Sequence, residues 1–406
     1  MRETVALRPP WGGAALTFAG GPAEAGLFAD IAAAGGRYGG GVLHALPELL
    51  PPDGIMVDAG AHVGLVAVPA AALVPGGRVH ALEPVPATAD LLAVNAAGHP
   101  AVTVHRIALS DHEGEAAMDA DAAFSAGSSI AAAGALRVPV RTLDAWAEDV
   151  GLGRLDVLKL DVEGAEVAAL RGARRTLARL RPALIVECNP PALLRQDGRG
   201  VRALHEELVR TAPHVVWLGR GGSRRRVPDA DALIELLRRH GVGDVLATPR
   251  PLRSRVRPRA VAGAVAERLG ELRPGAARFV TEAELAVRAL SAPPARMAPG
   301  EEADVEVEVR NTGPHALSGV WRAHPVRLAS RWHAPDGRPV AEGPRAPLPD
   351  PLPPGAAARR TVRVVAPAAE GPHELVVSGV QEHYAWLDAH GPAAAVRWPV
   401  EVAPGS

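Results

Sequence analysis

The segment Val57-Asp58-Ala59-Gly60-Ala61-His62-Val63-Gly64-Leu65 combines an acid at the end of an apolar run with a glycine turn. Glycine lets the backbone approach a ligand closely and adopt dihedral angles that other residues avoid. A dinucleotide site would need three glycines spaced Gly-x-Gly-x-x-Gly to hold a diphosphate, whereas only Gly60 and Gly64 are present. An acid at Asp58 would repel a diphosphate, but it suits a cofactor that carries an ammonium and a sulfonium group.

A second acid, Glu83, ends the next apolar run along the chain. A carboxylate in that position can accept hydrogen bonds from both hydroxyls of a ribose. A dehydrogenase would carry the same acid, and many strands end in a carboxylate that binds nothing. The two features indicate a cofactor site only in combination with a third segment.

That third segment is Lys159-Leu160-Asp161-Val162-Glu163-Gly164. Strand alternation places Lys159 and Asp161 on one face, and Glu163 follows by the same parity. A lysine in a buried strand is rare without a partner. We therefore expect Lys159, Asp161 and Glu163 to be catalytic, at the carboxyl edge of a parallel sheet where ligands bind. The alternative is a structural ion pair of Lys159 with Asp161 or Glu187.

Asp161 also belongs to a second set of oxygen ligands, with Glu187 and Asn189 at the end of a predicted neighbouring strand. Hard oxygen ligands of this kind could hold a magnesium ion. The competing explanation is that strand-end polar residues cap the helices that follow them.

These residues must be positioned by a sheet. From Ile55 to Asn189 short apolar runs alternate with helical stretches rich in Ala and Leu, which is typical of a sheet with crossover helices. The predicted strands are Ile55–Asp58, Val79–Glu83, Val102–Ile107, Val138–Thr142, Val157–Asp161 and Leu184–Glu187. The predicted helices are Ala87–Asn95, Leu143–Asp149 with Thr142 or Asp144 as its cap, Glu166–Arg179 and Val201–Thr211. Pro69 lies in the first crossover helix, where we expect a kink or a late start.

The pattern changes after residue 248. A basic segment from Arg250 to Arg259 and an amphipathic helix through Val261, Val265 and Leu269 predict a connector. Beyond Ser291 apolar residues alternate with polar ones between Pro and Gly turns, which predicts an antiparallel β-sandwich. We expect domains at 1–248, 249–290 and 291–406.

Composition excludes some functions. The chain has 44 Lys and Arg against 45 Asp and Glu, so no overall field attracts nucleic acid or an anionic membrane. The single cysteine, Cys188, excludes an internal disulfide, and the longest apolar stretch is too short to span a bilayer. We expect a cytoplasmic protein with a small-molecule, sugar or glycan acceptor, with no nucleic acid and no membrane insertion, and leave a homo-oligomer open.

The motifs described above, with Ala108-Leu109-Ser110-Asp111 and Glu187-Cys188-Asn189, resemble those of the FkbM family of methyltransferases in their order along the chain. The resemblance covers roughly Tyr38 to Asn189. It implies an α/β fold, a class I Rossmann-like methyltransferase sheet with flanking helices, that binds S-adenosylmethionine across its first two strands. The C-terminal sandwich resembles immunoglobulin-like modules.

The resemblance also implies roles for residues. Those that bind the cofactor would be Asp58, Gly60, His62, Gly64, Glu83, Ser110 and Asp111. On this basis Gly60→Val should fill the space beside the cofactor and leave the fold largely intact.

The function expected is O-methylation of a hydroxyl on a sugar, glycan or polyketide-type natural product. Candidate bases are Asp161, Glu163 and a Lys159 whose pKa is lowered by burial; magnesium at Asp161, Glu187 and Asn189 is another means of activating the hydroxyl. The alternatives are an NAD-dependent Rossmann oxidoreductase and a non-catalytic scaffold that binds glycans through its sandwich, where Trp321, Trp332, Trp386 and Trp398 could stack on sugars.

Overall fold

The computed structural model describes residues 3–119, 129–130, 136–252, 278–282, 284–318, 324–349, 351–382 and 384–404. The chain divides into two compact units, Met1–Ile234 with Val242–Arg273 and Glu235–Gly241 with Pro274–Ser406. No helix in the described ranges is long and apolar enough to cross a membrane. The predicted connector helix, the arginines from Arg253 to Arg259 and Trp321 lie outside the described residues.

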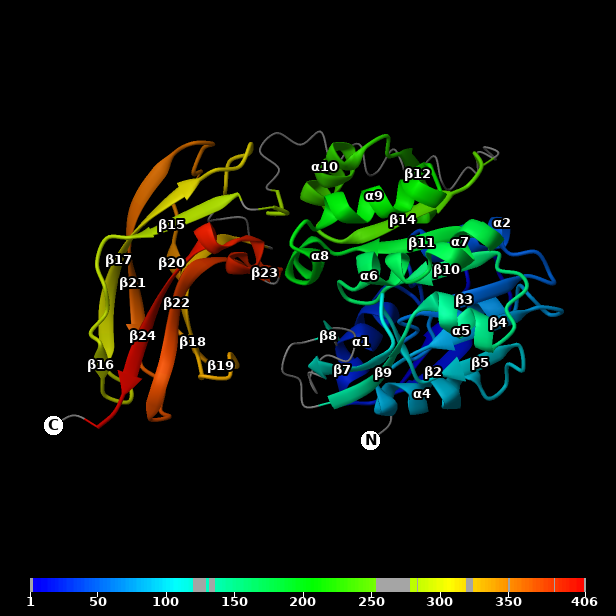
Figure 1. Ribbon diagram of the computed structural model, residues 1–406, viewed down its shortest axis with the longest axis horizontal. Helices are drawn as coiled ribbons and strands as arrows, with labels where there is room; N and C mark the ends of the chain where they lie inside the picture. Colours follow the sequence, from blue (N-terminus) through cyan, green and yellow to red (C-terminus); the bar gives the residue numbers. More distant parts are fainter. Residues whose placement is uncertain are drawn as a thin grey trace. The chain divides into compact units, whose positions relative to one another are not determined.

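An eight-stranded sheet forms the centre of the first unit (Figure 1). From one edge to the other its strands are β13 (Arg224–Arg226), β12 (His214–Leu218), β14 (Gly243–Thr248), β11 (Ala183–Cys188), β10 (Val157–Leu160), β3 (Ile55–Ala59), β4 (Arg78–Leu82) and β5 (Val102–His105). The strands from β11 to β5 run parallel, and β14 is antiparallel to both of its neighbours. The parallel strands bring Ala59, Leu82 and Leu160 to the same edge, because Ala59 pairs with both of the others.

Helices accompany this sheet. They are α1 (Ala25–Ala33), α2 (Val42–Leu49), α3 (Ala67–Ala71), α4 (Pro86–Ala96), α5 (Leu143–Asp149), α6 (Glu166–Arg171), α7 (Arg174–Leu180), α8 (Pro190–Asp197), α9 (Val201–Thr211) and α10 (Ala230–His240). Buried side chains of α2 and α4, such as Leu43 and Leu92, share one apolar cluster with Met56 and Ile185 of the sheet. The Rossmann-like α/β class predicted from the sequence is confirmed.

Smaller strands surround the sheet. At the N-terminus β1 (Glu3–Leu7) and β2 (Leu16–Gly20) form an antiparallel hairpin, followed by the short 3-10 helix η1 (Pro22–Glu24). A separate sheet contains β6 (Ala108–Leu109), β9 (Leu136–Arg141), β7 (Gly114–Asp119) and β8 (Ser129–Ile130). The N-terminal segment from β1 to α2 has no counterpart among the predicted elements.

Most predicted elements agree with the structure. Helices α5 and α9 have the predicted bounds, and the side chain of Thr142 accepts the N–H of Ala145 at 3.1 Å, as a cap should. The late start expected near Pro69 is confirmed, because α3 begins only at Ala67.

The single helix predicted from Glu166 to Arg179 is wrong. It is two helices, α6 and α7, interrupted at Gly172. The carboxylate of Asp144 accepts the N–H groups of Arg175 and Thr176 at 3.0 and 2.7 Å, so it caps the start of α7 from another part of the chain.

The second unit is built of two sheets. The smaller contains β15 (Leu285–Ala289), β17 (Glu302–Asn311) and β21 (Ala357–Val365). The larger contains β16 (Arg296–Met297), β24 (Ala395–Val402), β22 (Gly371–Gln381), β18 (Val326–His333) and β19 (Pro339–Glu342), with β20 (Ala346–Pro347) and β23 (Ala385–Trp386) at its side. Val307 and Val364 of the first sheet share a buried cluster with Trp332 and Leu375 of the second, so the sheets pack as a sandwich (Figure 1).

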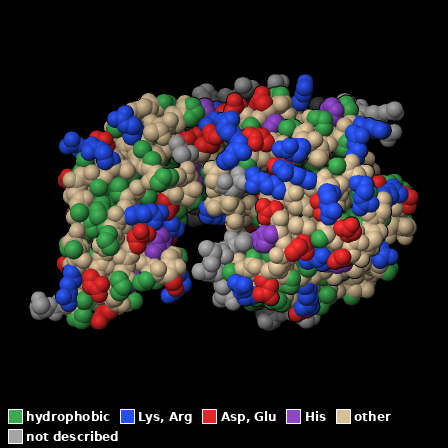
Figure 2. Space-filling model, viewed as in Figure 1, with side chains coloured by type: hydrophobic (Ala, Val, Ile, Leu, Met, Phe, Trp, Pro, Cys, Tyr) green, Lys and Arg blue, Asp and Glu red, His purple; other side chains and the backbone are tan. Residues whose placement is uncertain are grey.

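Charges of both signs are mixed on the surface. Figure 2 shows Lys and Arg side chains interspersed with Asp and Glu over the visible face of each unit. This distribution agrees with the near balance of 44 and 45 charges in the sequence.

Candidate active site

The turn after β3 requires glycine. Gly60 has φ +73°, and a Cβ there would lie 1.7 Å from the carbonyl oxygen of Asp161. The N–H groups of Gly60 and Ala61 both donate to the carbonyl of Leu82 at 3.0 Å. Gly60→Val would therefore collide with the backbone of the neighbouring strand end, which contradicts the expectation that the fold would stay largely intact.

His62 and Glu83 are joined across the edge of the sheet. The Glu83 carboxylate, only 6% exposed, accepts the N–H of His62 through Oε2 and that of Val85 through Oε1, each at 3.0 Å. His62 has φ +50°, a conformation uncommon for residues other than glycine. These two backbone bonds fix the direction of the Glu83 carboxylate at the end of β4.

Lys159 is held between two carboxylates. Its Nζ lies 3.1 Å from Oδ1 of Asp58 and 3.2 Å from Oδ2 of Asp161. The Asp58 side chain is fully buried, and that of Lys159 is 6% exposed. Burial by itself lowers the pKa of Lys159, but the charges of Asp161 and Asp58 outweigh it and raise the pKa above its ordinary value. The prediction of a Lys159 base with a lowered pKa is therefore wrong: the ammonium stays protonated.

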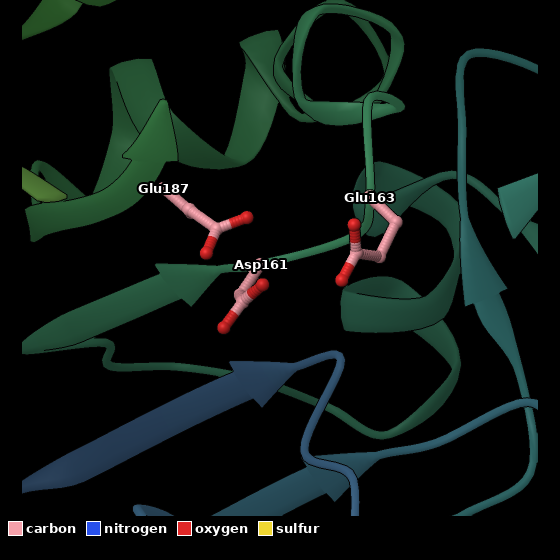
Figure 3. Close-up of side chains that lie close together, drawn as sticks. All are labelled: Asp161, Glu163 and Glu187. Atoms are coloured by element: carbon pink, nitrogen blue, oxygen red, sulfur yellow. The ribbon is translucent and has the colours of Figure 1, made fainter. Parts of the chain in front are cut away.

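Three carboxylates meet beside this lysine. Asp161, Glu163 and Glu187 each offer an oxygen, and these oxygens lie within 4.8 Å of one another. Figure 3 shows the three side chains converging from the ends of β10 and β11 and from the loop that follows β10. Glu163 reaches this position with φ +53°, so, like His62, it departs from ordinary backbone geometry at the same site.

Burial and mutual repulsion raise the pKa values of Glu163 and Glu187, so these two acids stay protonated to a higher pH than an ordinary glutamate. Burial, followed by the charges of Asp161 and Glu166, raises the pKa of Glu163 from 4.5 to about 8. Burial and the charges of Asp161 and Glu163 raise the pKa of Glu187 well above its ordinary value. Oε2 of Glu187 is buried and has no hydrogen-bond partner. A positive ligand would favour the charged forms of these groups.

Sequence reasoning missed two residues of this site, Tyr38 and Asp244. Tyr38 lies among the glycines of the loop before α2, and burial together with the charge of Asp161 raises the pKa of its phenol. Asp244 of β14 lies opposite Glu187 of β11 in the sheet. Burial and the charge of Asp161 raise the pKa of Asp244 to about 7. The glycines around Tyr38 signal a turn, but only tertiary contacts bring that turn to the sheet.

One cavity connects most of these groups. It is lined by Leu27, Tyr38, Ala59, Gly60, Ala61, His62, Leu65, Val66, Glu83, Pro84, Ile107, Ala108, Leu109, Met118, Lys159, Asp161, Val162, Glu163, Ala165 and Glu187. The lining includes all three residues predicted to be catalytic, Lys159, Asp161 and Glu163. It also includes three of the residues predicted to bind the cofactor: Gly60, His62 and Glu83.

The other predicted site residues lie behind or beside the lining. Asp58 is buried against Lys159, and a Cβ at Gly64 would meet Leu92 at 2.7 Å. Ser110 is buried and Asp111 is exposed, outside the lining. Asn189 caps α8, because its Oδ1 accepts the N–H of Ala192 at 3.4 Å.

Comparison with known proteins agrees with this geometry. Residues 58–241 match the family model described as the methyltransferase FkbM domain. This stretch of the chain is an FkbM methyltransferase domain. It is S-adenosylmethionine-dependent, as the resemblance implied, and the acids that line the cavity, Glu83, Asp161, Glu163 and Glu187, all lie within the matched residues.

A curated protein is similar to part of this chain. The AMB antimetabolite synthetase AmbE of Pseudomonas aeruginosa is 30% identical over 235 residues, which are 48% of this chain and 10% of AmbE. The chain therefore corresponds to about a tenth of that protein's length.

Some solved structures show a more distant similarity to the chain. The O-methyltransferase TomG of Streptomyces achromogenes, solved with S-adenosylmethionine, is 16% identical and covers 51% of this chain and 77% of its own, with a TM-score of 0.30. A precorrin-6y C5,15-methyltransferase of Geobacter metallireducens is 15% identical over 52% of this chain and 87% of its own, with a TM-score of 0.29. A CARDB domain of Pyrococcus furiosus is 16% identical over 30% of this chain and 92% of its own, with a TM-score of 0.19.

Proposed function

We propose that the FkbM domain transfers a methyl group from S-adenosylmethionine to a hydroxyl of a sugar, glycan or polyketide-type natural product. The observation that carries the cofactor assignment is the charge of the cavity wall. Four carboxylates, Glu83, Asp161, Glu163 and Glu187, line it against one ammonium, Lys159. Burial raises the pKa values of Glu163 and Glu187, and a cationic cofactor favours their charged forms, whereas the diphosphate of NAD would oppose them.

Glu83 is the residue proposed to hold the ribose. Both of its oxygens accept one backbone N–H, which leaves further lone pairs for hydroxyl groups. The apolar side chains of Ile107, Leu109 and Met118 lie in the same cavity, where an adenine ring could pack. These apolar contacts replace the polar contacts expected from Ser110 and Asp111.

Glu163 is the proposed general base. A hydroxyl is a poor nucleophile, so its proton must leave as the oxygen attacks the methyl carbon and the carbon–sulfur bond breaks. The proton would pass to the carboxylate of Glu163, whose raised pKa of about 8 makes it a better proton acceptor than an ordinary glutamate. Lys159 neutralises Asp58 and Asp161 and takes no proton.

Magnesium is a second use of the same oxygens. The three carboxylates within 4.8 Å of one another have the chemistry of a hard-cation site, with Glu163 in place of the predicted Asn189. A bound ion would polarise the acceptor hydroxyl. Addition of a chelator distinguishes magnesium binding from proton transfer by Glu163. Turnover that survives the chelator assigns the three carboxylates to proton transfer.

Two observations suggest the class of acceptor. The partial match to an antimetabolite synthetase supports a small natural product, and an accompanying sandwich supports a glycan. We keep the cytoplasmic location as part of the proposal, because the only cysteine is buried and reduced.

Transfer of labelled methyl tests the proposal. The full chain is incubated with methyl-labelled S-adenosylmethionine and a pool of sugars, glycans and hydroxylated polyketides. We expect label in a hydroxyl, lost in Glu163→Gln and retained in Glu148→Gln, a matched change of an exposed glutamate outside the cavity. Label on nitrogen or carbon, or equal rates in both variants, would contradict the assignment.

A further inference from the structure

The N-terminal segment, which precedes the FkbM match, contacts the loop after β3 that contains His62. Glu24 of η1 is 2% exposed, although it carries a carboxylate. Its Oε2 accepts the N–H of Gly21 at 2.6 Å, and its Oε1 lies 3.5 Å from Nε2 of His62. Because burying a carboxylate without partners is costly, these contacts help to stabilise Glu24 in its buried position.

His62 connects Glu24 to the proposed ribose ligand. Its imidazole faces Glu24, while its backbone N–H donates to Oε2 of Glu83 at 3.0 Å. With φ +50°, the His62 backbone is in the left-handed region, which is uncommon for residues other than glycine. A contact from outside the loop can therefore decide where this N–H points.

Asn95 of α4 makes a second tie between the same segments. Its side chain accepts the N–H of Ala19 at 2.8 Å and donates to the carbonyls of Ala19 and Val63 at 3.0 and 2.8 Å. The loop is thus held at two successive residues, His62 and Val63. Only His62 also contacts Glu83.

We propose that Glu24 is a positioning residue for cofactor binding: through His62 it fixes the backbone N–H that orients Glu83 toward the ribose. This inference rests on the proposed function. Glu24 is not among the residues that line the cavity. Its effect must therefore pass through His62, and it should concern the ribose more than the rest of the cofactor.

Calorimetry with S-adenosylhomocysteine on the full chain tests this proposal. Glu24→Gln keeps an oxygen for the N–H of Gly21 but removes the charge that faces His62, and we expect affinity to fall about tenfold. Glu48→Gln is the matched control, because Glu48 pairs with Arg224 at 2.9 Å in the same segment and away from the cavity. Its affinity should equal that of the parent.

Two further readouts separate positioning from general stability. In competition experiments, the preference for adenosine over 2′,3′-dideoxyadenosine should shrink in Glu24→Gln. Combining Glu24→Gln with His62→Asn should weaken binding no further than His62→Asn alone, since both changes break one pathway. Asparagine tolerates the positive φ at this position, so the single His62→Asn variant serves if Glu24→Gln does not fold.

The outcomes are distinct. A parent protein that does not bind S-adenosylhomocysteine contradicts the proposed function. A parent that binds it, with unchanged affinity in Glu24→Gln or His62→Asn, additive losses, or an unchanged preference for the ribose hydroxyls, overturns the role of Glu24 alone.

Discussion

Lys159 is the only lysine of this chain, which otherwise uses arginine for its basic side chains. A compact ammonium fits between Asp58 and Asp161 at 3.1 and 3.2 Å, where the larger planar guanidinium of arginine would have to displace a carboxylate. The sequence predicted a buried, catalytic lysine and offered an ion pair with Asp161 or Glu187 only as the alternative, whereas its partners are Asp58 and Asp161. It could not give the direction of the pKa shift, which depends on how closely two carboxylates approach the ammonium.

We expect Lys159→Met to destabilise the protein. The change leaves Asp58 buried without its partner, and breaking a buried pair costs about 3 to 5 kcal/mol. Urea unfolding measures the loss. The control is Arg154→Met, which removes an exposed arginine paired with Asp53 and should leave stability close to that of the parent. A Lys159→Met protein as stable as the control would show that the pair does not stabilise the fold.

The same lysine offers a direct test of its charge. Lysine labelled with ¹⁵N gives one side-chain ammonium signal in this chain, because there is one lysine. We expect the signal of a protonated amine through the whole pH range in which the protein is folded. Deprotonation near neutral pH would restore Lys159 as a candidate base.

Glu163 sets the expected pH dependence. A base must be deprotonated to act, and the pKa of Glu163 is raised from 4.5 to about 8. The kcat/KM for the acceptor should therefore rise about tenfold per pH unit and level off above pH 8. In Glu163→Gln, kcat/KM should no longer rise with pH in this way, and the rate should fall about 100- to 10,000-fold.

Stability should change in the opposite direction with pH. A carboxyl group whose folded pKa is raised stabilises the fold while it is protonated, and this contribution is lost as the pH rises through about 8. Without cofactor, the free energy of unfolding should fall as the pH rises from 4.5 to about 8, and it should fall more in the parent than in Glu163→Gln. An equal slope in both proteins would mean that Glu163 is not buried as a neutral acid.

Strands and their ends followed from local sequence, since apolar runs closed by acids predicted β3, β4, β10 and β11. Helix α5 followed from its cap at Thr142. Features that depend on distant residues did not follow. The break between α6 and α7 needs Asp144 from another helix, and Tyr38 reaches the cavity only through the fold of the N-terminal segment.

Strand β14 provides a test at the level of elements. It lies inside the sheet, between β11 and β12, but beyond residue 241, where the family match ends. We expect a fragment of residues 1–252, which ends where the described part of the first unit ends, to fold and bind S-adenosylmethionine. A fragment of residues 1–241 should not, because β11 and β12 lose their shared partner. Equal binding by the two fragments would contradict this account of the sheet.

Among the described residues, the α/β sheet and the sandwich have separate buried apolar clusters. A ligand that binds one folded unit stabilises that unit by about 2.7 kcal/mol at a hundredfold excess over Kd. Calorimetric scans should show two transitions, only one of which moves upward with S-adenosylmethionine.

Trp332→Ala identifies the other transition. Trp332 is completely buried in the sandwich core, so its truncation should cost about 3 to 5 kcal/mol there and leave cofactor affinity unchanged. A single transition that shifts as a whole, or a changed affinity in this variant, would show that the cores are coupled.

The most direct test of the central claim is a calorimetric titration of the full chain with S-adenosylmethionine and, separately, with NAD. The four carboxyl groups that line the cavity predict binding of the first, which is a cation, and none of the second, which carries a diphosphate. Glu83→Ala removes a charge-assisted contact to the ribose worth about 1.5 to 3 kcal/mol, so affinity should fall about 10- to 100-fold. Tighter binding of NAD, or S-adenosylmethionine affinity that is the same in Glu83→Ala and the parent, would contradict the account.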